Sequence, residues 1–173
     1  MGNVFSDKKA ERAKRAERAE QERVKRDIRE LQNEMEIRSR AHNMCAEYYG
    51  KWKSILFVLL LLVGGLSAGH KFLGWKIPPA DDPTSIAIFT LGVAATVAAF
   101  VIQQCHSRTA DAHEKHHKAQ MNCQSIADRA RSASDSSESS SSLRKRHDAL
   151  LKDKGNSSEI SYEQWAYDRA SKK

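Results

Sequence analysis

SIAIFTLGVAATVAAFVI, residues 85–102, decides the fold of this chain, because it runs for 18 residues without a charged side chain. A helix of that length is roughly 27 Å long, which is close to the hydrocarbon thickness of a bilayer. A second apolar stretch, ILFVLLLLVGGLSAG, occupies residues 55–69. Lys53 and Lys71 flank it and can reach the headgroups, while Trp52 supplies an interfacial aromatic ring. The two stretches predict two transmembrane helices.

Basic residues predict the topology of this pair. Of the 29 Lys and Arg, 14 lie before Ser54 and 13 lie after Ile102. The positive-inside rule then places both flanks in the cytosol and the intervening loop on the other side of the membrane. A buried helical hairpin in a soluble core is the competing interpretation, but the rest of the chain has too little apolar surface to cover two such helices. We expect an all-α, multi-pass membrane protein with two spans and both termini cytosolic.

Charge also limits the partners expected for the two arms, the segments before and after the pair of spans. The chain has 173 residues and a formal net charge of +7, with basic residues interleaved among acidic ones. A modest basic excess beside the spans suits the anionic cytoplasmic leaflet of the lipid bilayer. Nucleic acid is not expected as a partner, because the arms lack aromatic rings for base stacking until the membrane edge. No cofactor is expected.

Two sites of lipid attachment are predicted. The start MGNVFS fits the myristoylation pattern, in which Gly2 is followed four residues later by a serine. Cys105 follows the second apolar stretch closely, in a position where reversible palmitoylation occurs. Cys45 and Cys123 fall on the same cytosolic side, where thiols stay reduced, so no structural disulfide is expected. Ordinary helix packing is the alternative role for each thiol.

Residues 7–49 predict one long charged helix, because no Gly or Pro interrupts them and Ala, Arg, Glu and Lys are abundant. Within it a narrow apolar stripe follows a 4-3-4 spacing: Val24, Ile28, Leu31 and Met35. The same register weakens as it continues through Arg38, His42, Cys45 and Tyr49. We expect this helix to pack on a neighbouring subunit or on the other arm, and to bind a cytosolic protein partner.

Small residues form the predicted contact surface of the spans, since small side chains let transmembrane helices approach closely. Gly65 and Gly69 have the G-x-x-x-G spacing. The complete set of predicted packing residues is Gly64, Gly65, Ala68, Gly69, Gly92, Ala95 and Ala99. Neither span contains an ionisable residue, which argues against a proton relay or a transporter site. The spans should pack on each other or on further copies in a homo-oligomer.

His113-Glu114-Lys115-His116-His117 matches H-E-x-x-H, the zinc-protease pattern of two histidines one turn apart with Glu as general base. A catalytic zinc also needs a third protein ligand and a walled site, whereas a serine tract follows here. We expect neither a metal site at His113 and His117 nor enzymatic activity. A polar helix face is the simpler interpretation, and a weak metal or pH response of the histidines is the alternative.

The remaining segments follow from composition. Residues 132–142 hold eight serines without apolar periodicity, which predicts a disordered linker and a substrate for acidophilic kinases. The expected segments, in chain order, are a myristoylation signal at 1–6, a charged cytosolic helix at 7–49, a first transmembrane helix at 50–75, a short non-cytosolic loop at 76–84, a second transmembrane helix at 85–104, a cytosolic helix at 105–131, the serine-rich linker at 132–142, and a short amphipathic helix with an aromatic tail at 143–173.

The run AHNMCAEYY at 41–49, followed by a span, a glycine-rich stretch ending near Trp75 and a second span, resembles the SLATT family. The run HHKA at 116–119 and the later Ile126 extend the resemblance over roughly residues 38 to 133. Members have two transmembrane helices embedded in cytosolic helical extensions and are described as effectors that oligomerise into pores. The resemblance implies a self-associating, pore-forming membrane protein. The alternative is a membrane anchor or scaffold, including a virion membrane protein, whose charged arms bind a soluble partner.

Overall fold

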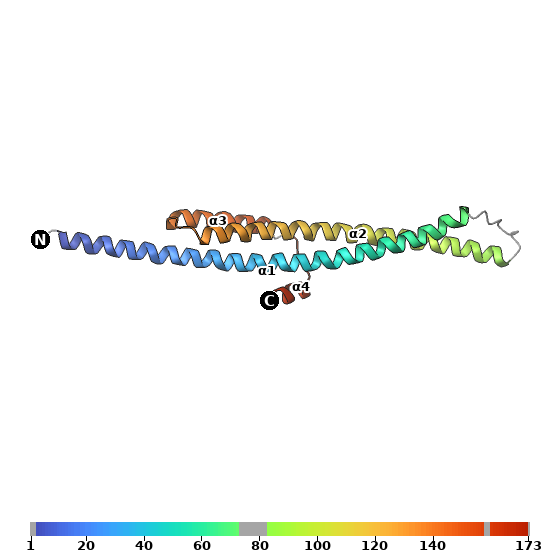
Figure 1. Cartoon of the computed structure of the whole chain (residues 1–173), viewed down its shortest axis with the longest axis horizontal. Coiled ribbons are helices and arrows are strands. Elements are labelled where there is room, and N and C mark those ends of the chain that lie inside the picture. Colours follow the sequence, from blue (N-terminus) through green and yellow to red (C-terminus); the bar gives the residue numbers. More distant parts are fainter. Residues whose placement is uncertain (1–2, 73–82, 158–159, 173) are drawn as a thin grey trace. The chain divides into compact units, whose positions relative to one another are not determined.

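The computed structural model describes residues 3–72, 83–157 and 160–172, with side chains left out for 3–8, 66–72, 83–86, 88 and 89. Over these residues the protein holds four α-helices and no strand, which confirms the all-α prediction (Figure 1). The helices are α1 (Asn3–Phe72), α2 (Pro83–Ser134), α3 (Ser140–Ser157) and α4 (Gln164–Ser171).

The first two helices are longer than the predicted segments, because each continues through a predicted boundary. The expected division between residues 49 and 50 lies inside α1, where Ser54 donates a hydrogen bond from Oγ to the carbonyl oxygen of Gly50 at 3.1 Å. A single glycine costs a helix only about 1 kcal/mol, which its packing can offset. The predicted division between residues 104 and 105 lies inside α2, which begins with Pro83 at its first helical position.

The chain divides into two compact units. We call residues 1–45 and 115–173 the bundle unit, and residues 46–114 the hairpin unit. Helices α1 and α2 contribute to both units, whereas α3 and α4 belong to the bundle unit alone.

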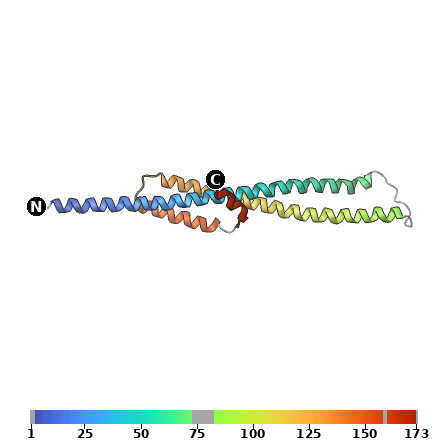
Figure 2. The same ribbon diagram turned by 90° about the horizontal axis from the view of Figure 1, so that it is seen from below.

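The bundle unit is built around an apolar core to which three helices contribute. In Figures 1 and 2, α3 and the carboxyl-terminal half of α2 lie beside the amino-terminal half of α1. The 4-3-4 stripe of α1 is buried in this core together with Cys123, Ile126 and three alanines of α2. Leu143 and Leu150 of α3 complete it. The apolar stripe of the charged arm therefore packs on the other arm of the same chain.

The serine tract differs from the expected disordered linker. Ser134 still belongs to α2 and α3 begins at Ser140, so only residues 135–139 are non-helical. Glu138 organises this connection, since its carboxylate accepts a hydrogen bond from Ser142 Oγ at 2.6 Å and pairs with Arg146 at 2.7 Å. Burial of Leu143 supplies the apolar contact that composition alone does not reveal.

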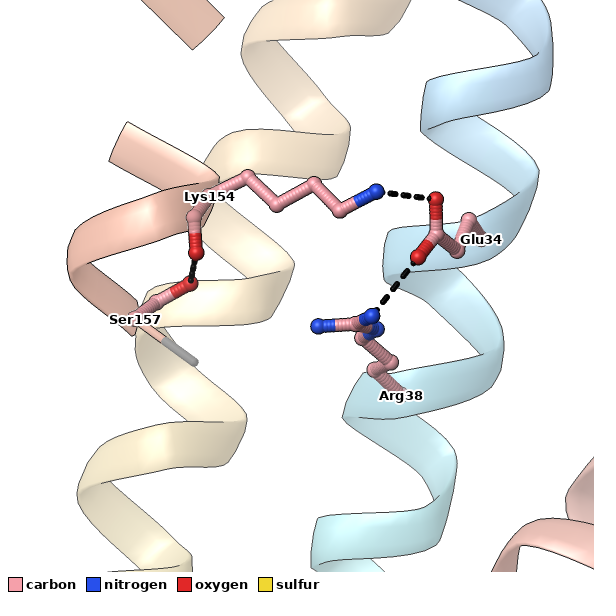
Figure 3. Close-up of polar contacts among 4 residues, drawn as sticks. All are labelled: Glu34, Arg38, Lys154 and Ser157. Carbon is pink, nitrogen blue, oxygen red and sulfur yellow. Dashed lines mark hydrogen bonds and ion pairs between the residues drawn. The ribbon is translucent and has the colours of Figure 1, made fainter. Parts of the chain in front are cut away.

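Polar contacts join α3 to α1 at the other end of α3. Glu34 of α1 pairs with Lys154 of α3 at 2.5 Å and with Arg38 of its own helix at 2.8 Å (Figure 3). Each of these three side chains is between 23% and 33% exposed, so solvent screens the pairs only in part. Arg144 adds an exposed pair with Glu20 at 2.8 Å. These contacts set the register of α3 beside the apolar core.

The hairpin unit is an antiparallel pair formed by α1 and α2. Phe57 lies against His106 with ring centroids 6.0 Å apart, and an added Cβ on Gly50 would lie 3.0 Å from the ring of His113. Partly covered side chains recur at helical spacing along each member of the pair: Leu56, Leu60 and Val63 on α1, and Ala95, Ala99 and Ile102 on α2. These residues mark the two facing sides of the helices.

Candidate functional site

Large apolar side chains are exposed along both helices of the hairpin unit. Leu91 is 73% exposed and Phe100 is 62% exposed, although nothing polar in either side chain calls for contact with water. Among the described residues of the two helices, the aliphatic and phenylalanine side chains of this kind are Ile55, Phe57, Val58, Leu59, Leu61, Leu62, Leu91, Val93, Val97, Phe100 and Val101. We call these eleven residues the apolar band. Exposed apolar surface of this extent marks a protein interface or a membrane contact.

The two units differ in the burial of their apolar side chains. The bundle unit buries its stripe in the α1–α2–α3 core, where Ile28 and Met35 are fully covered. The hairpin unit leaves the apolar band outside. Across the ranges that the structure describes, no helix holds an apolar run long enough to cross a bilayer.

The predicted packing residues fall into three groups. An added Cβ on Gly64, Gly65 or Gly92 would meet no described heavy atom within 4 Å. Ala95 and Ala99 are partly covered on the side of α2 that faces α1. Ala68 and Gly69 lie in α1, but their side-chain surroundings are outside the described residues. A packing role for the whole set stays a prediction.

The structure describes one of the two predicted lipid-attachment sites. Gly2 lies outside the described residues. Cys105 is exposed on α2, whereas Cys45 and Cys123 are buried in the bundle unit. Exposure leaves the Cys105 thiol accessible to a modifying reagent, and its acylation stays a prediction.

The histidines of the H-E-x-x-H motif have unlike surroundings. His113 lies beside Gly50, while His117 is exposed. Within the described residues, no group of three or more His, Cys, Asp or Glu side chains is arranged to hold a metal ion. His116, which occupies a variable position of the motif, is instead only 7% exposed.

A buried histidine pair is the most unusual polar feature of the bundle unit. Nδ1 of His42 in α1 lies 3.1 Å from Nδ1 of His116 in α2, and His42 is only 2% exposed. Two neutral imidazoles can make this contact when one Nδ1 carries the proton and the other accepts it. One turn earlier on α1, Ser39 donates from Oγ to the carbonyl oxygen of Gln120 at 3.4 Å. The pair thus belongs to a short polar layer at the end of the apolar core.

Residues near the carboxyl terminus complete this polar layer. The ring of Tyr162 meets His42 edge-on with centroids 5.3 Å apart, and it stacks on Tyr167 at 5.2 Å. The backbone of Glu163 lies near the Cys45 thiol and lowers its pKa, against the larger effect of burial. Ala166 and Ala170 of α4 are fully buried. A segment close to the end of the chain therefore covers the histidine pair.

Burial makes the two imidazoles poor bases. Desolvation, with smaller contributions from His116 and Arg38, lowers the pKa of His42 to about 4. Desolvation also lowers the pKa of His116, while the nearby carboxylate of Glu163 acts in the opposite direction. Burial raises the pKa of the Cys45 and Cys123 thiols. At neutral pH the polar layer therefore holds neutral imidazoles and neutral thiols.

Sequence reasoning missed this layer because it interpreted polar residues in the α1 register as the end of the stripe. His42 and Cys45 continue the spacing of Val24, Ile28, Leu31 and Met35, and both are buried. The uninterrupted register was the signal that could have found them. Their partner on α2 was not predictable from that spacing, since His42 and His116 are 74 residues apart.

Comparison of the chain with protein-family models, with curated proteins and with solved structures finds no match.

Proposed function

We propose that this protein is an integral membrane protein whose hairpin unit inserts into a lipid bilayer and self-associates there, with the bundle unit as a cytosolic helical module. The apolar band carries the proposal. Burying one Val, Leu, Ile or Phe side chain completely is worth about 1.5–3 kcal/mol. Eleven side chains that are about half exposed would therefore gain on the order of 10 kcal/mol on entering lipid.

Aromatic and basic residues next to the apolar band support insertion of the hairpin unit with residues 48–54 at the membrane surface. Trp52 is 45% exposed and Tyr48 is 46% exposed, and their rings lie 6.4 Å apart, within two turns of Ile55. Trp and Tyr are enriched at the membrane interface, and Lys51 and Lys53 are exposed beside them. The proposed cytosolic boundary of the first span thus lies near residues 48–54. Both apolar stretches also continue into residues 66–86, whose side chains are outside the described set.

Self-association is the second element of the proposal. Gly64, Gly65 and Gly92 present backbone with open space where a side chain would begin. Close backbone approach at small residues is how transmembrane helices associate when lipid offers no hydrophobic driving force. An oligomer formed in this way serves either as an anchor for the bundle unit or, as the SLATT resemblance implies, as a pore. The anchor role requires only insertion and association. A pore must also conduct ions, so a conductance measurement distinguishes the two roles.

Insertion is tested by reconstituting the full chain with liposomes and measuring co-flotation and resistance to alkaline extraction. The double variant Val97→Lys, Phe100→Lys places two charges in the apolar band and should abolish stable insertion. Met121 and Leu151 are apolar and exposed in the bundle unit at 58% and 43%, so Met121→Lys, Leu151→Lys is the matched control. The control should insert like the wild type. Equal extraction of both double variants would contradict the membrane role of the hairpin unit.

Association is tested in the same vesicles by crosslinking or by native mass spectrometry of the solubilised oligomer. Gly92→Leu should reduce the oligomer without unfolding the monomer, because an added side chain meets open space. Gly155 in α3 has equally open surroundings, so Gly155→Leu should leave the oligomer intact. Ion leakage from the vesicles distinguishes a pore from an anchor. An oligomer that survives Gly92→Leu and Gly65→Leu would refute association through these surfaces.

A further inference from the structure

The terminal segment, residues 160–171, depends on the rest of the bundle unit for its structure. Its helix α4 has eight residues, and Glu163 at its N-cap makes no side-chain capping hydrogen bond. Isolated helices of this length are unstable in water. The order of the segment therefore comes from docking, which buries Ala166 and Ala170 completely.

The docked segment lies on the histidine pair itself. The ring of Tyr162 meets His42 in a T-shaped contact, and the backbone of Glu163 lies near the Cys45 thiol on the next turn of α1. In both ribbon views α4 lies beside α1 (Figures 1 and 2). Undocking the segment would remove the cover that Tyr162 and Glu163 provide and admit water to the two imidazoles.

We propose that the terminal segment is a pH-sensitive latch, held in place while the His42–His116 pair is neutral and released when both imidazoles are protonated. The inference concerns the bundle unit alone and does not rest on membrane insertion.

Protonation removes the hydrogen bond between the two imidazoles that the docked segment covers. A 3.1 Å contact between two Nδ1 atoms needs one donor and one acceptor, and two imidazolium rings present only donors. They also repel each other at this distance, and Arg38 adds a third positive charge from α1. The Nε of Arg38 is buried and has no hydrogen-bond partner among the described residues. The carboxylate on this side, Glu34, already pairs with Arg38 and Lys154, so it compensates added positive charge only in part.

The remaining titratable groups around the pair do not reverse this balance. Glu163, from the terminal segment, faces His116 with a negative charge that favours its protonation, but it is one carboxylate on an exposed residue. Burial keeps the thiols of Cys45 on α1 and Cys123 on α2 neutral by raising their pKa. The pKa of Tyr162 is raised as well, chiefly by burial, so this ring also stays neutral. Two imidazolium rings and a guanidinium would thus face two carboxylates, Glu163 and Glu34, of which Glu34 already pairs with Arg38 and Lys154.

The terminal segment should undock at a higher pH than the one at which the α1–α2–α3 core unfolds, because the core buries far more apolar surface. Eleven buried residues from three helices form the core, whereas α4 itself contributes only two buried alanines. Protonation of one buried imidazole weakens docking by up to about tenfold for each pH unit below its ordinary pKa. Because two imidazoles take up protons, docking of the segment should depend more steeply on pH below their ordinary pKa.

Hydrogen–deuterium exchange of the full chain tests the latch at about pH 7.5 and about pH 4.5, with intrinsic rates corrected for pH. We expect the amides of residues 160–171 to lose at least tenfold in protection at the lower pH, while core amides of α1 at 24–35 keep theirs. Unchanged protection of the segment would overturn the proposal. So would equal loss in the segment and the core, because that result describes acid unfolding of the whole bundle.

A pair of variants separates the histidines from other titrating groups. His42→Gln with His116→Gln provides amides that can bond each other without titrating, so the segment should stay protected at both pH values. His117→Gln, an exposed neighbour on the same helix, should keep the wild-type response. A double variant that still releases the segment at low pH would refute the role of the pair. If that variant does not fold, the comparison of segment with core in the wild type decides alone.

Discussion

Truncation of Leu150 is the sharpest test of how α3 is held in the bundle unit. Leu150 is 4% exposed and is one of only two buried residues in α3, whereas the adjacent Leu151 is 43% exposed. Leu→Ala in a packed core costs about 2–5 kcal/mol, since it combines lost transfer energy with a residual cavity. We therefore expect Leu150→Ala to lower the free energy of unfolding of the bundle unit by about 3 kcal/mol.

The matched control is Leu151→Ala, which removes the same atoms from the same helix one position away. Because Leu151 is already half in solvent, its truncation should cost less than about 1 kcal/mol. Both values come from denaturant unfolding of the full chain followed by circular dichroism, with the midpoint and slope fitted together. Equal costs for the two leucines would show that α3 does not dock through this face.

Three further predictions concern thiols, acid and ion pairs. Cys105 should react with a thiol reagent in the native protein, whereas Cys45 should react only on unfolding, since it is buried and its pKa is raised; mass spectrometry of the labelled chain measures both. Docking of the terminal segment, measured by hydrogen exchange of residues 160–171, should be level above about pH 6.5 and weaken as the pH drops toward 4, because undocking exposes His42 to the proton that it resists when buried, with a pKa of about 4. That difference amounts to about 3 kcal/mol, and the decline should shrink in His42→Gln to the part that His116 contributes. Glu34→Gln should cost about 1 kcal/mol through its two partly buried ion pairs, while Glu11→Gln, whose pair with Arg15 of the same helix is well exposed, should leave the unfolding midpoint unchanged.

Local sequence signals predicted the helices better than their boundaries. The absence of Gly and Pro from residues 7–49 predicted a long helix, and α1 indeed covers that range. Gly50 was interpreted as a boundary, yet α1 passes through it, and His113 lies close to where a side chain at this position would begin. The serine tract was interpreted as disordered from its composition, whereas Leu143 and Glu138 give it long-range and local contacts.

By itself the sequence determined where the long helices lie and which of their faces are apolar, because both depend on neighbours within a few positions along the chain. The stripe on α1 and the apolar stretches at 55–69 and 85–102 are properties of that kind. Only the tertiary structure decided which partners these faces meet. Glu34 pairs with Lys154 across 120 residues and His42 meets His116 across 74, since both contacts depend on how the helices align in the bundle. No local spacing encodes that alignment, and the buried histidine pair exists only because of it.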